Sequence, residues 1–149
     1  LILKDAEGFR RYIWMLALSF FSATLFCILV PNGQDLRPAD LVVTDIFTWA
    51  VQLTYTLDTN TNVFPSVHVL GVVAAVTSVW ETPGLRKSGW RWFAAVYGLV
   101  IIASTLLVKQ HTILDVAAAI PWGMLSYLIV YRVIGRRRNM LPQASPQGE

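Results

Sequence analysis

The sequence predicts an all-α, polytopic membrane protein: a helical bundle of four spanning helices with one further helix at the membrane interface. Two observations carry this prediction. Of the 149 residues, 55% are hydrophobic and 14% are charged, and the mean hydropathy is +0.53, which is too apolar for an ordinary soluble domain. The apolar residues are also concentrated in four uncharged runs, each close to the length at which a helix crosses ~30 Å of hydrocarbon. These runs are 12–30, 63–80, 92–108 and 116–131.

The first run follows a mixed-charge lead-in, 1–11, and ends at Pro31 and Gly33, which are residues that stop helices. After a polar stretch, the segment 41–57 carries its apolar residues at helical spacing along one face, with polar residues elsewhere. Such a pattern is typical of a helix that lies in the interface and does not span the membrane. The apolar face comprises Ile46, Trp49, Ala50, Leu53 and Leu57.

The other three runs are separated by polar segments. The link 58–62 precedes the second run, the basic loop 81–91 precedes the third, and the interruption 109–115 precedes the fourth. Pro121 lies near the start of the fourth run, where a proline can kink a membrane helix without ending the span.

We expect residues 1–138 to form one membrane-embedded domain and the Pro- and Gln-rich residues 139–149 to be a disordered tail. The chain begins with Leu1, so we also expect an N-terminal part to be missing from this sequence. The single cysteine, Cys27, lies in an apolar run and has no partner for an intramolecular disulfide.

Charge placement predicts the orientation of the bundle. Four crossings put the lead-in, the 81–91 loop and the C-terminus on one side, together with all of the 12 Lys and Arg residues except Arg37 and Lys109. The positive-inside rule assigns that side to the cytoplasm. The net charge of +3 does not indicate nucleic-acid binding, because the basic residues are not interleaved with aromatics on a soluble surface.

The same topology brings chemically active residues to the extracytoplasmic end. His111 precedes Asp115 by four residues, so on a helix the carboxylate could orient the imidazole and leave its other nitrogen free as a nucleophile or base. His68, at the start of the second run, lies at the same depth. Ionisable groups at a membrane helix end are costly unless they face a wet cavity, which favours a phosphoryl-transfer or hydrolase site over ordinary interfacial histidines. A metal site is a weaker alternative, because a third strong ligand at short spacing is missing.

Three short motifs then resemble those of the type 2 phosphatidic acid phosphatase (PAP2) superfamily. FPSVH at 64–68 looks like the PSxH motif, and Arg37 with Pro38 matches the end of Kx6RP. Ser104, His111 and Asp115 reproduce the spacing of SRx5Hx3D. The resemblance covers roughly 30–135, and the order and common membrane side of the motifs make the combination specific.

The resemblance implies a metal-independent phosphohistidine mechanism, without a cofactor, that acts on a lipid phosphate in the bilayer. By this resemblance His111 is the nucleophile, Asp115 orients it, and His68 protonates the leaving oxygen. Phosphate oxygens would be held by Arg37, Ser66 and Ser104. A helix that starts at Pro65 and Ser66 is also, on physical grounds, a natural anion site.

The sequence departs from the family pattern at three positions. Val30 replaces the first-motif lysine, Thr105 the third-motif arginine, and Val67 the usual glycine. Lys109, one turn after Thr105, could supply the missing charge, although a snorkelling interfacial lysine is the simpler interpretation. The missing arginine and the sequence KQH resemble the branch of inositol phosphorylceramide and related sphingolipid synthases.

Three hypotheses for the function follow. The favoured one is a lipid phosphatase that hydrolyses a phosphomonoester or pyrophosphate. The second is a phosphotransferase that uses the same histidines and passes a phospho-headgroup to a lipid alcohol. The third is an inactive lipid-binding homologue that has lost activity with the cations replaced at Val30 and Thr105.

Overall fold

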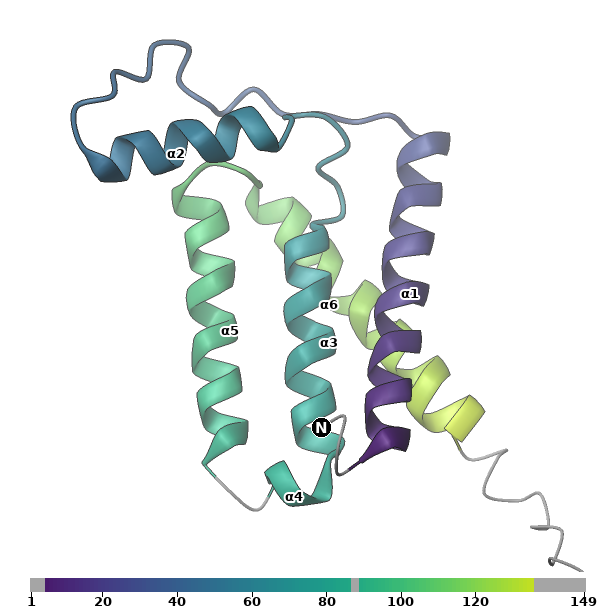
Figure 1. Ribbon diagram of the computed structural model, residues 1–149. Coiled ribbons are helices and arrows are strands. Elements are labelled where there is room, and N and C mark those ends of the chain that lie inside the picture. The colour runs from purple at the N-terminus through teal and green to yellow at the C-terminus, as the bar shows by residue number, and fades with distance from the viewer. Residues whose placement is uncertain (1–4, 87–88, 136–149) are drawn as a thin grey trace, which may run out of the picture.

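The computed structural model describes residues 5–86 and 89–135, and it confirms an all-α helical membrane bundle (Figure 1). In chain order the helices are α1 (Ala6–Leu29), α2 (Ile46–Leu57), α3 (Val67–Glu81), α4 (Pro83–Arg86), α5 (Trp90–Leu107), α6 (Ile113–Tyr127) and its π-helical continuation η1 (Leu128–Ile134). The predicted tail, 139–149, lies outside the described residues.

Four helices run in alternating directions, and α3 lies at the centre with α1, α5 and α6 packed around it (Figure 1). Consequently α1 and α5 end at the same side of the bundle where α3 and α6 begin. This is the arrangement that the alternating apolar runs predict. It brings the segments before α3 and before α6, which contain the motif residues, to one end.

Three helical stretches are long and apolar enough to cross a membrane: Ala6–Leu29, Trp90–Leu107 and Ile113–Ile134. The last one passes through Pro121 without ending, as the sequence predicted. The fourth, α3, has 15 residues and is shorter than the predicted run 63–80. The helix begins at Val67, directly after the start at Pro65 and Ser66 that the motif predicted, and Val63 and Phe64 of the apolar run precede it.

Glycines allow two helices to approach α3 closely. A Cβ on Gly123 of α6 would lie 2.9 Å from Val73 Cγ1, and a Cβ on Gly98 of α5 would lie 2.7 Å from Val72 Cγ1. Small residues at helix contacts are the usual way for membrane helices to pack, since the bilayer provides no hydrophobic force between them. The close packing fixes the starts of α3 and α6 relative to each other.

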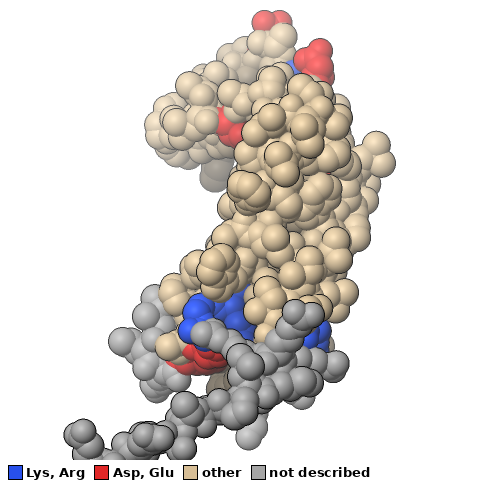
Figure 2. Space-filling view, turned by 90° about the vertical axis from the view of Figure 1, so that its right-hand side faces the viewer, with Lys and Arg blue, Asp and Glu red and all other residues tan. Residues whose placement is uncertain are grey.

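The described charged residues gather at the two ends of the bundle, and a broad uncharged surface lies between them (Figure 2). At the end where α1 begins, Glu81 accepts hydrogen bonds from Tyr127 and Arg132. Trp80 and Trp92 pack edge to face there with ring centroids 5.7 Å apart. Basic and aromatic side chains at one end are typical of a membrane interface.

The helix α2 lies crosswise over the ends of α3 and α5 (Figure 1), and each of its residues is exposed or half-buried. It begins at Ile46, later than the predicted start at 41, because Asp45 caps it by accepting hydrogen bonds from the Phe47 and Thr48 amides. Tyr55 anchors it to the bundle by donating a hydrogen bond to the Val108 carbonyl, at 2.8 Å. Its crosswise position agrees with the predicted interfacial helix.

Candidate active site

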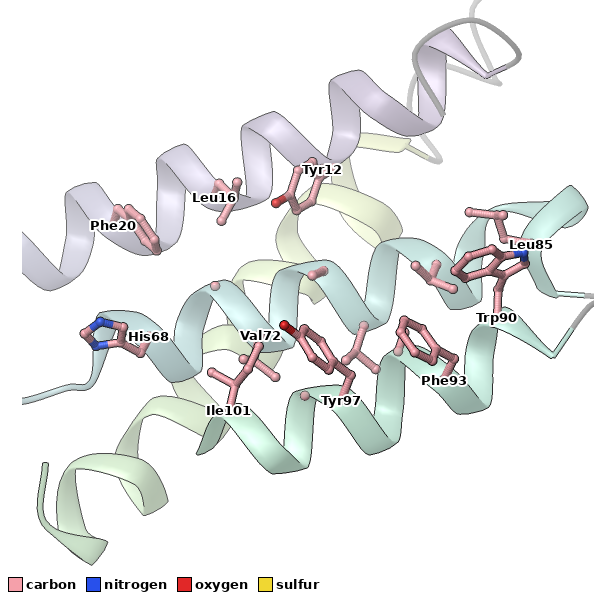
Figure 3. Close-up of a pocket in the computed structure, with 16 residues that line it drawn as sticks. Tyr12, Leu16, Phe20, His68, Val72, Leu85, Trp90, Phe93, Tyr97 and Ile101 are labelled. Atoms are coloured by element: carbon pink, nitrogen blue, oxygen red, sulfur yellow. The ribbon is translucent and has the colours of Figure 1, made fainter. Parts of the chain in front are cut away.

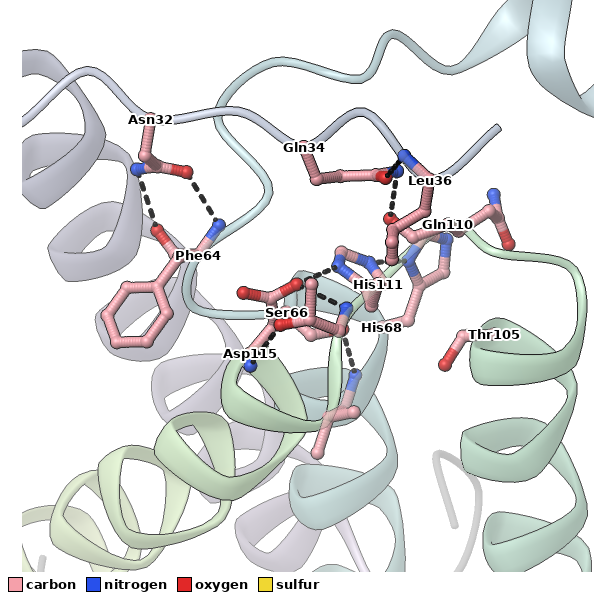
Figure 4. Close-up of polar contacts among 12 residues, drawn as sticks. Asn32, Gln34, Leu36, Phe64, Ser66, His68, Thr105, Gln110, His111 and Asp115 are labelled. Carbon is pink, nitrogen blue, oxygen red and sulfur yellow. Dashed lines mark hydrogen bonds and ion pairs between the residues drawn. The ribbon is translucent and has the colours of Figure 1, made fainter. Parts of the chain in front are cut away.

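Two histidines that are 43 positions apart in the sequence meet at the end of the bundle below α2. His68 lies in the first turn of α3, and His111 lies directly before α6. The Nδ1 atom of His68 is 3.1 Å from the Nε2 atom of His111, and the rings meet edge to face (Figure 4). The predicted convergence of the two histidines is therefore present.

The start of α3 is fixed by contacts with two other segments. Ser66 is fully buried and caps the helix, its hydroxyl accepting a hydrogen bond from the Val69 amide at 3.4 Å. Asn32 holds the backbone of Phe64 at two points, accepting from its amide at 2.9 Å and donating to its carbonyl at 3.3 Å (Figure 4). The Ser66 amide also donates to the Asp115 carbonyl, so α3 and α6 start from a common point.

His111 is positioned by the way α5 ends. The helix ends at Leu107, and Lys109 adopts a left-handed conformation with φ of 54°. The chain then folds back, so that the amides of Gln110 and His111 both donate to the Thr105 carbonyl. As a result the His111 ring is buried, with 5% of its surface exposed, whereas His68 is exposed.

Asp115 lies behind His111, but not on a shared helical face. His111 precedes α6, and Asp115 is the third residue of that helix, where it forms a capping box with Thr112. Its Oδ2 atom accepts a hydrogen bond from the Thr112 amide at 2.6 Å and lies 3.7 Å from His111 Nδ1. The expected same-face geometry was thus wrong, because His111 is not helical. The carboxylate nonetheless faces the ring nitrogen that it was expected to orient.

The environment lowers the pKa of His111 below the ordinary value of 6.5. Burial is the largest cause, and the proximity of His68 acts in the same direction. Asp115, Asp58 and the Val63 backbone oppose the shift but do not cancel it. At neutral pH the buried imidazole is therefore neutral, which is the state that a nucleophile requires.

This pKa shift predicts a pH-dependent stability. Because the pKa of His111 is lower in the folded state, the unfolded chain binds more protons below about pH 6.5, and the free energy of unfolding must fall there. We expect the melting temperature of the purified protein in detergent to decrease from neutral pH to about pH 5. His111→Gln should flatten this decrease. If the melting temperatures of parent and variant depend on pH in the same way, the lowered pKa of His111 is not the cause of the pH dependence.

Among the predicted phosphate-binding residues, Ser66 caps α3 directly before His68, and Ser104 lies in the last turn of α5. The Ser104 side chain is exposed, and its hydroxyl donates to the Ile101 carbonyl of its own helix at 2.7 Å. Lys109 is also exposed. The expectation that Lys109 points the same way as Thr105 assumed one continuous helix, and it was wrong because α5 ends between them.

Arg37 is held at the end of α2. Its guanidinium donates to the backbone carbonyls of Tyr55, Asp58 and Thr59, lies 3.5 Å from Asp58 Oδ2, and stacks 4.8 Å from the centre of the Tyr55 ring. These contacts bind α2 to the segment that follows α1. A phosphate clamp would require Arg37 to leave some of these partners.

Sequence reasoning missed a set of polar residues that build the walls of the site. Gln110 donates from Nε2 to Asp58 Oδ2 at 3.0 Å. Gln34 donates to the Lys109 carbonyl at 2.9 Å and to the Gln110 carbonyl at 3.3 Å, the second of which is drawn in Figure 4. Together with Asn32 they connect three separate segments around the histidines. A signal was available, since Asn32 and Gln34 lie inside the first motif and Gln110 directly precedes His111.

Within 5–86 and 89–135, groups of three or more His, Cys, Asp or Glu side chains that could hold a metal ion are not found. The two histidines and the carboxylate therefore meet beside the capped starts of two helices at the end of a membrane bundle, which is an arrangement of nucleophilic and acid–base groups next to backbone amides.

The fold and the site define a helical membrane protein with a paired-histidine centre of the phosphatase type. The family model of the PAP2 superfamily matches residues 9–139, and the chain belongs to this superfamily. Members of the superfamily are generally phosphatases or phosphotransferases. No curated protein and no solved structure matches the chain.

Proposed function

We propose that this protein is an integral-membrane lipid phosphatase that hydrolyses a phosphomonoester or pyrophosphate lipid through a phosphohistidine intermediate. The observation that carries the proposal is the 3.1 Å contact between His68 Nδ1 and His111 Nε2, with Asp115 on the far side of the His111 ring. A neutral, oriented imidazole beside a second imidazole supplies both a nucleophile and an acid.

In the first step, the lone pair on His111 Nε2 forms a bond to phosphorus while the bond from phosphorus to the leaving oxygen breaks. His68 gives its proton to that oxygen, and Asp115 stabilises the positive charge on the His111 ring through the proton on Nδ1. Since Nε2 now contacts His68, the phosphoryl group must enter between the rings. His68 is the residue that moves, because it is exposed while His111 is buried.

In the second step, water attacks phosphorus and His68 takes its proton. The bond between phosphorus and Nε2 breaks, which returns the lone pair to His111 and releases phosphate. The developing charge on the equatorial oxygens faces the positive end of the α3 dipole, where Ser66 caps the helix. Arg37 and Lys109 are the nearest candidates in sequence for additional charge, in place of the cations absent at Val30 and Thr105.

We place the site on the extracytoplasmic face. The support for this orientation is that the basic side chains Arg10, Arg11, Arg91 and Arg132 belong to the opposite end of the bundle from the histidines. The positive-inside rule makes that end cytoplasmic.

A second candidate, transfer of the phospho-headgroup to a lipid alcohol, is favoured by one observation. His111 is almost fully buried, so a phosphoryl group on it would be shielded from bulk water. Thr105, in place of the family arginine, is buried as well, with its hydroxyl on the Ile102 carbonyl. A site without that guanidinium has more room for a headgroup larger than phosphate.

Phosphate release from purified protein in detergent tests the proposal. The substrates are phosphatidic acid, a polyprenyl pyrophosphate and p-nitrophenyl phosphate, each with and without added diacylglycerol or ceramide. We expect phosphate release without an alcohol acceptor, and none from His111→Gln. If the lipid alcohol acquires the phosphate or the phospho-headgroup and free phosphate is not released, the protein is a phosphotransferase. If the protein binds the lipids and forms neither product, it is an inactive lipid-binding homologue.

A further inference from the structure

An apolar groove of about 560 Å³ runs along the bundle between α1, α3 and α5 (Figure 3). Each helix contributes a row of residues one turn apart. These rows run from Phe20 to Tyr12 on α1, from His68 to Val79 on α3 and from Ile101 to Trp90 on α5, and Leu85 of α4 completes the lining.

The groove is continuous with the candidate active site, because His68 lines its upper end. In Figure 3 the His68 ring lies at one end of the groove, and Leu85 and Trp90 lie at the other. His68 is therefore the residue that the groove and the phosphoryl-transfer centre share. A ligand with its phosphate at His111 would have its apolar part directed into the groove.

The groove extends along most of α3. His68 and Val79, which both line it, are eleven residues apart, which at the rise of an α-helix is ~16.5 Å. The lower end of the groove, at Leu85 and Trp90, belongs to the end of the bundle opposite the histidines (Figure 1). A hydrocarbon chain that starts at the active site would thus lie along the groove toward that opposite end.

Small residues make the centre of the groove open, and large ones close its lower end. A Cβ on Gly71 would find only the tip of the Phe20 ring, at 3.8 Å. Tyr97 and Phe93, whose rings stack 5.7 Å apart, and Trp90 are each more than half exposed although they point into the groove (Figure 3). Their exposed faces are apolar surface that a hydrocarbon chain can cover.

We infer that the groove binds one hydrocarbon chain of the lipid phosphate and measures its length, with Leu85 and Trp90 as the floor. This inference rests on the proposed function for the position of the phosphate. It adds a basis for selectivity: chains that fill the groove gain buried apolar contact, and longer chains must bend at the floor. The occupant is a single saturated or prenyl chain of a bilayer lipid, not another protein helix.

Three substitutions on one face of α3 test the measuring role, because they narrow the groove at increasing depth. Gly71→Phe, Ala75→Phe and Val79→Phe lie ~4.5, ~10.5 and ~16.5 Å below His68. Phosphate release is measured with single-chain alkyl phosphates from hexyl to octadecyl. We expect the longest alkyl chain that is hydrolysed efficiently to be shorter for Ala75→Phe than for Val79→Phe, and shortest for Gly71→Phe. The ratio of long-chain to short-chain activity should fall at least about tenfold for Gly71→Phe, as when methylenes lose their pocket.

A matched control is Leu99→Phe, which adds similar bulk on α5 at a position that is 66% exposed and outside the groove lining. It should leave the chain-length profile unchanged. The inference is overturned if the three groove variants keep the parent profile, or if the shortening does not follow depth. It is also overturned if they change oligomeric state while the profile stays constant, since a protein helix would then be the occupant.

A second readout separates the groove from the proposed chemistry. Alkyl phosphonates that cannot be hydrolysed, with a diazirine either near the headgroup or at the terminal carbon, are crosslinked to the parent protein in detergent. The near-headgroup probe should label residues around Phe20 and Ile101, and the terminal probe residues around Leu85 and Trp90. This labelling pattern without any phosphate release would refute the proposed phosphatase activity and support chain binding in the groove. Phosphate release together with labelling that does not depend on probe position would support the phosphatase activity and refute chain binding in the groove.

Discussion

His111→Ala is expected to lower phosphate release by at least about 10³-fold, because it removes the proposed nucleophile. The loss should be the same for p-nitrophenyl phosphate and for a lipid phosphate, since both substrates must transfer their phosphoryl group to Nε2. Steady-state phosphate release at saturating substrate measures it. The substitution should also abolish the covalent phospho-enzyme.

Folding must be checked for this variant, because the His111 ring is buried. His111→Gln keeps a polar side chain of similar size and serves as the second variant. Both should retain cooperative thermal unfolding at neutral pH and remain monodisperse in detergent. If either variant is folded and still releases phosphate within about tenfold of the parent, His111 is not the nucleophile.

His68→Ala is expected to have a large effect that depends on the leaving group. General acid catalysis is typically worth 10²–10⁴-fold, and an alkoxide needs the proton far more than p-nitrophenolate does. We therefore expect a loss of ~10²-fold or more on an alkyl phosphate and a much smaller loss on p-nitrophenyl phosphate. Phosphate release from the two substrates, compared at equal enzyme concentration, measures the difference.

His68 is exposed, so its replacement should not disturb the core. It also lines the groove, and the alkyl series therefore needs a short-chain member to separate proton transfer from chain binding. Equal losses on alkyl and aryl substrates of similar size would show that His68 binds phosphate and does not act as the acid.

The fold could be predicted from the sequence because membrane helices follow a local rule. Uncharged apolar runs specify α5 and the start of α6 to within three residues, and they specify the end of α1, which begins six residues earlier than its predicted run. The Asp45 cap of α2 is the kind of feature that sequence can show. The boundary of α3 was harder. Val63 and Phe64 are as apolar as the residues after them, yet they precede the helix, and Asn32 holds the Phe64 backbone through two hydrogen bonds that the sequence does not show.

The sequence could predict which residues belong to the candidate site better than it could predict how they are arranged. Alternating helices are sufficient to bring His68 and His111 to one end of the bundle. Helical periodicity could not show that His111 lies outside α6, or that the Lys109 backbone is in the left-handed region. It also could not show that the Ser104 hydroxyl donates to a carbonyl of its own helix. These depend on how α5 ends, and a helix end within an apolar sequence leaves little local signal.

The groove was not predictable from any one segment. Gly71, Ala75 and Gly98 look like ordinary small residues of membrane helices, and Gly98 does serve close packing against Val72. Only the relative placement of α1, α3 and α5 shows that these small residues surround a space that begins at His68.

Trapping the covalent intermediate tests the central claim most directly. The purified protein is mixed with a radiolabelled lipid phosphate, quenched within one turnover under basic conditions that preserve phosphohistidine, and digested for mapping of the phosphorylated residue. We predict stoichiometric label on His111, formed as fast as turnover and lost under acid. Label on another residue, or turnover without any labelled intermediate, would contradict the phosphohistidine mechanism.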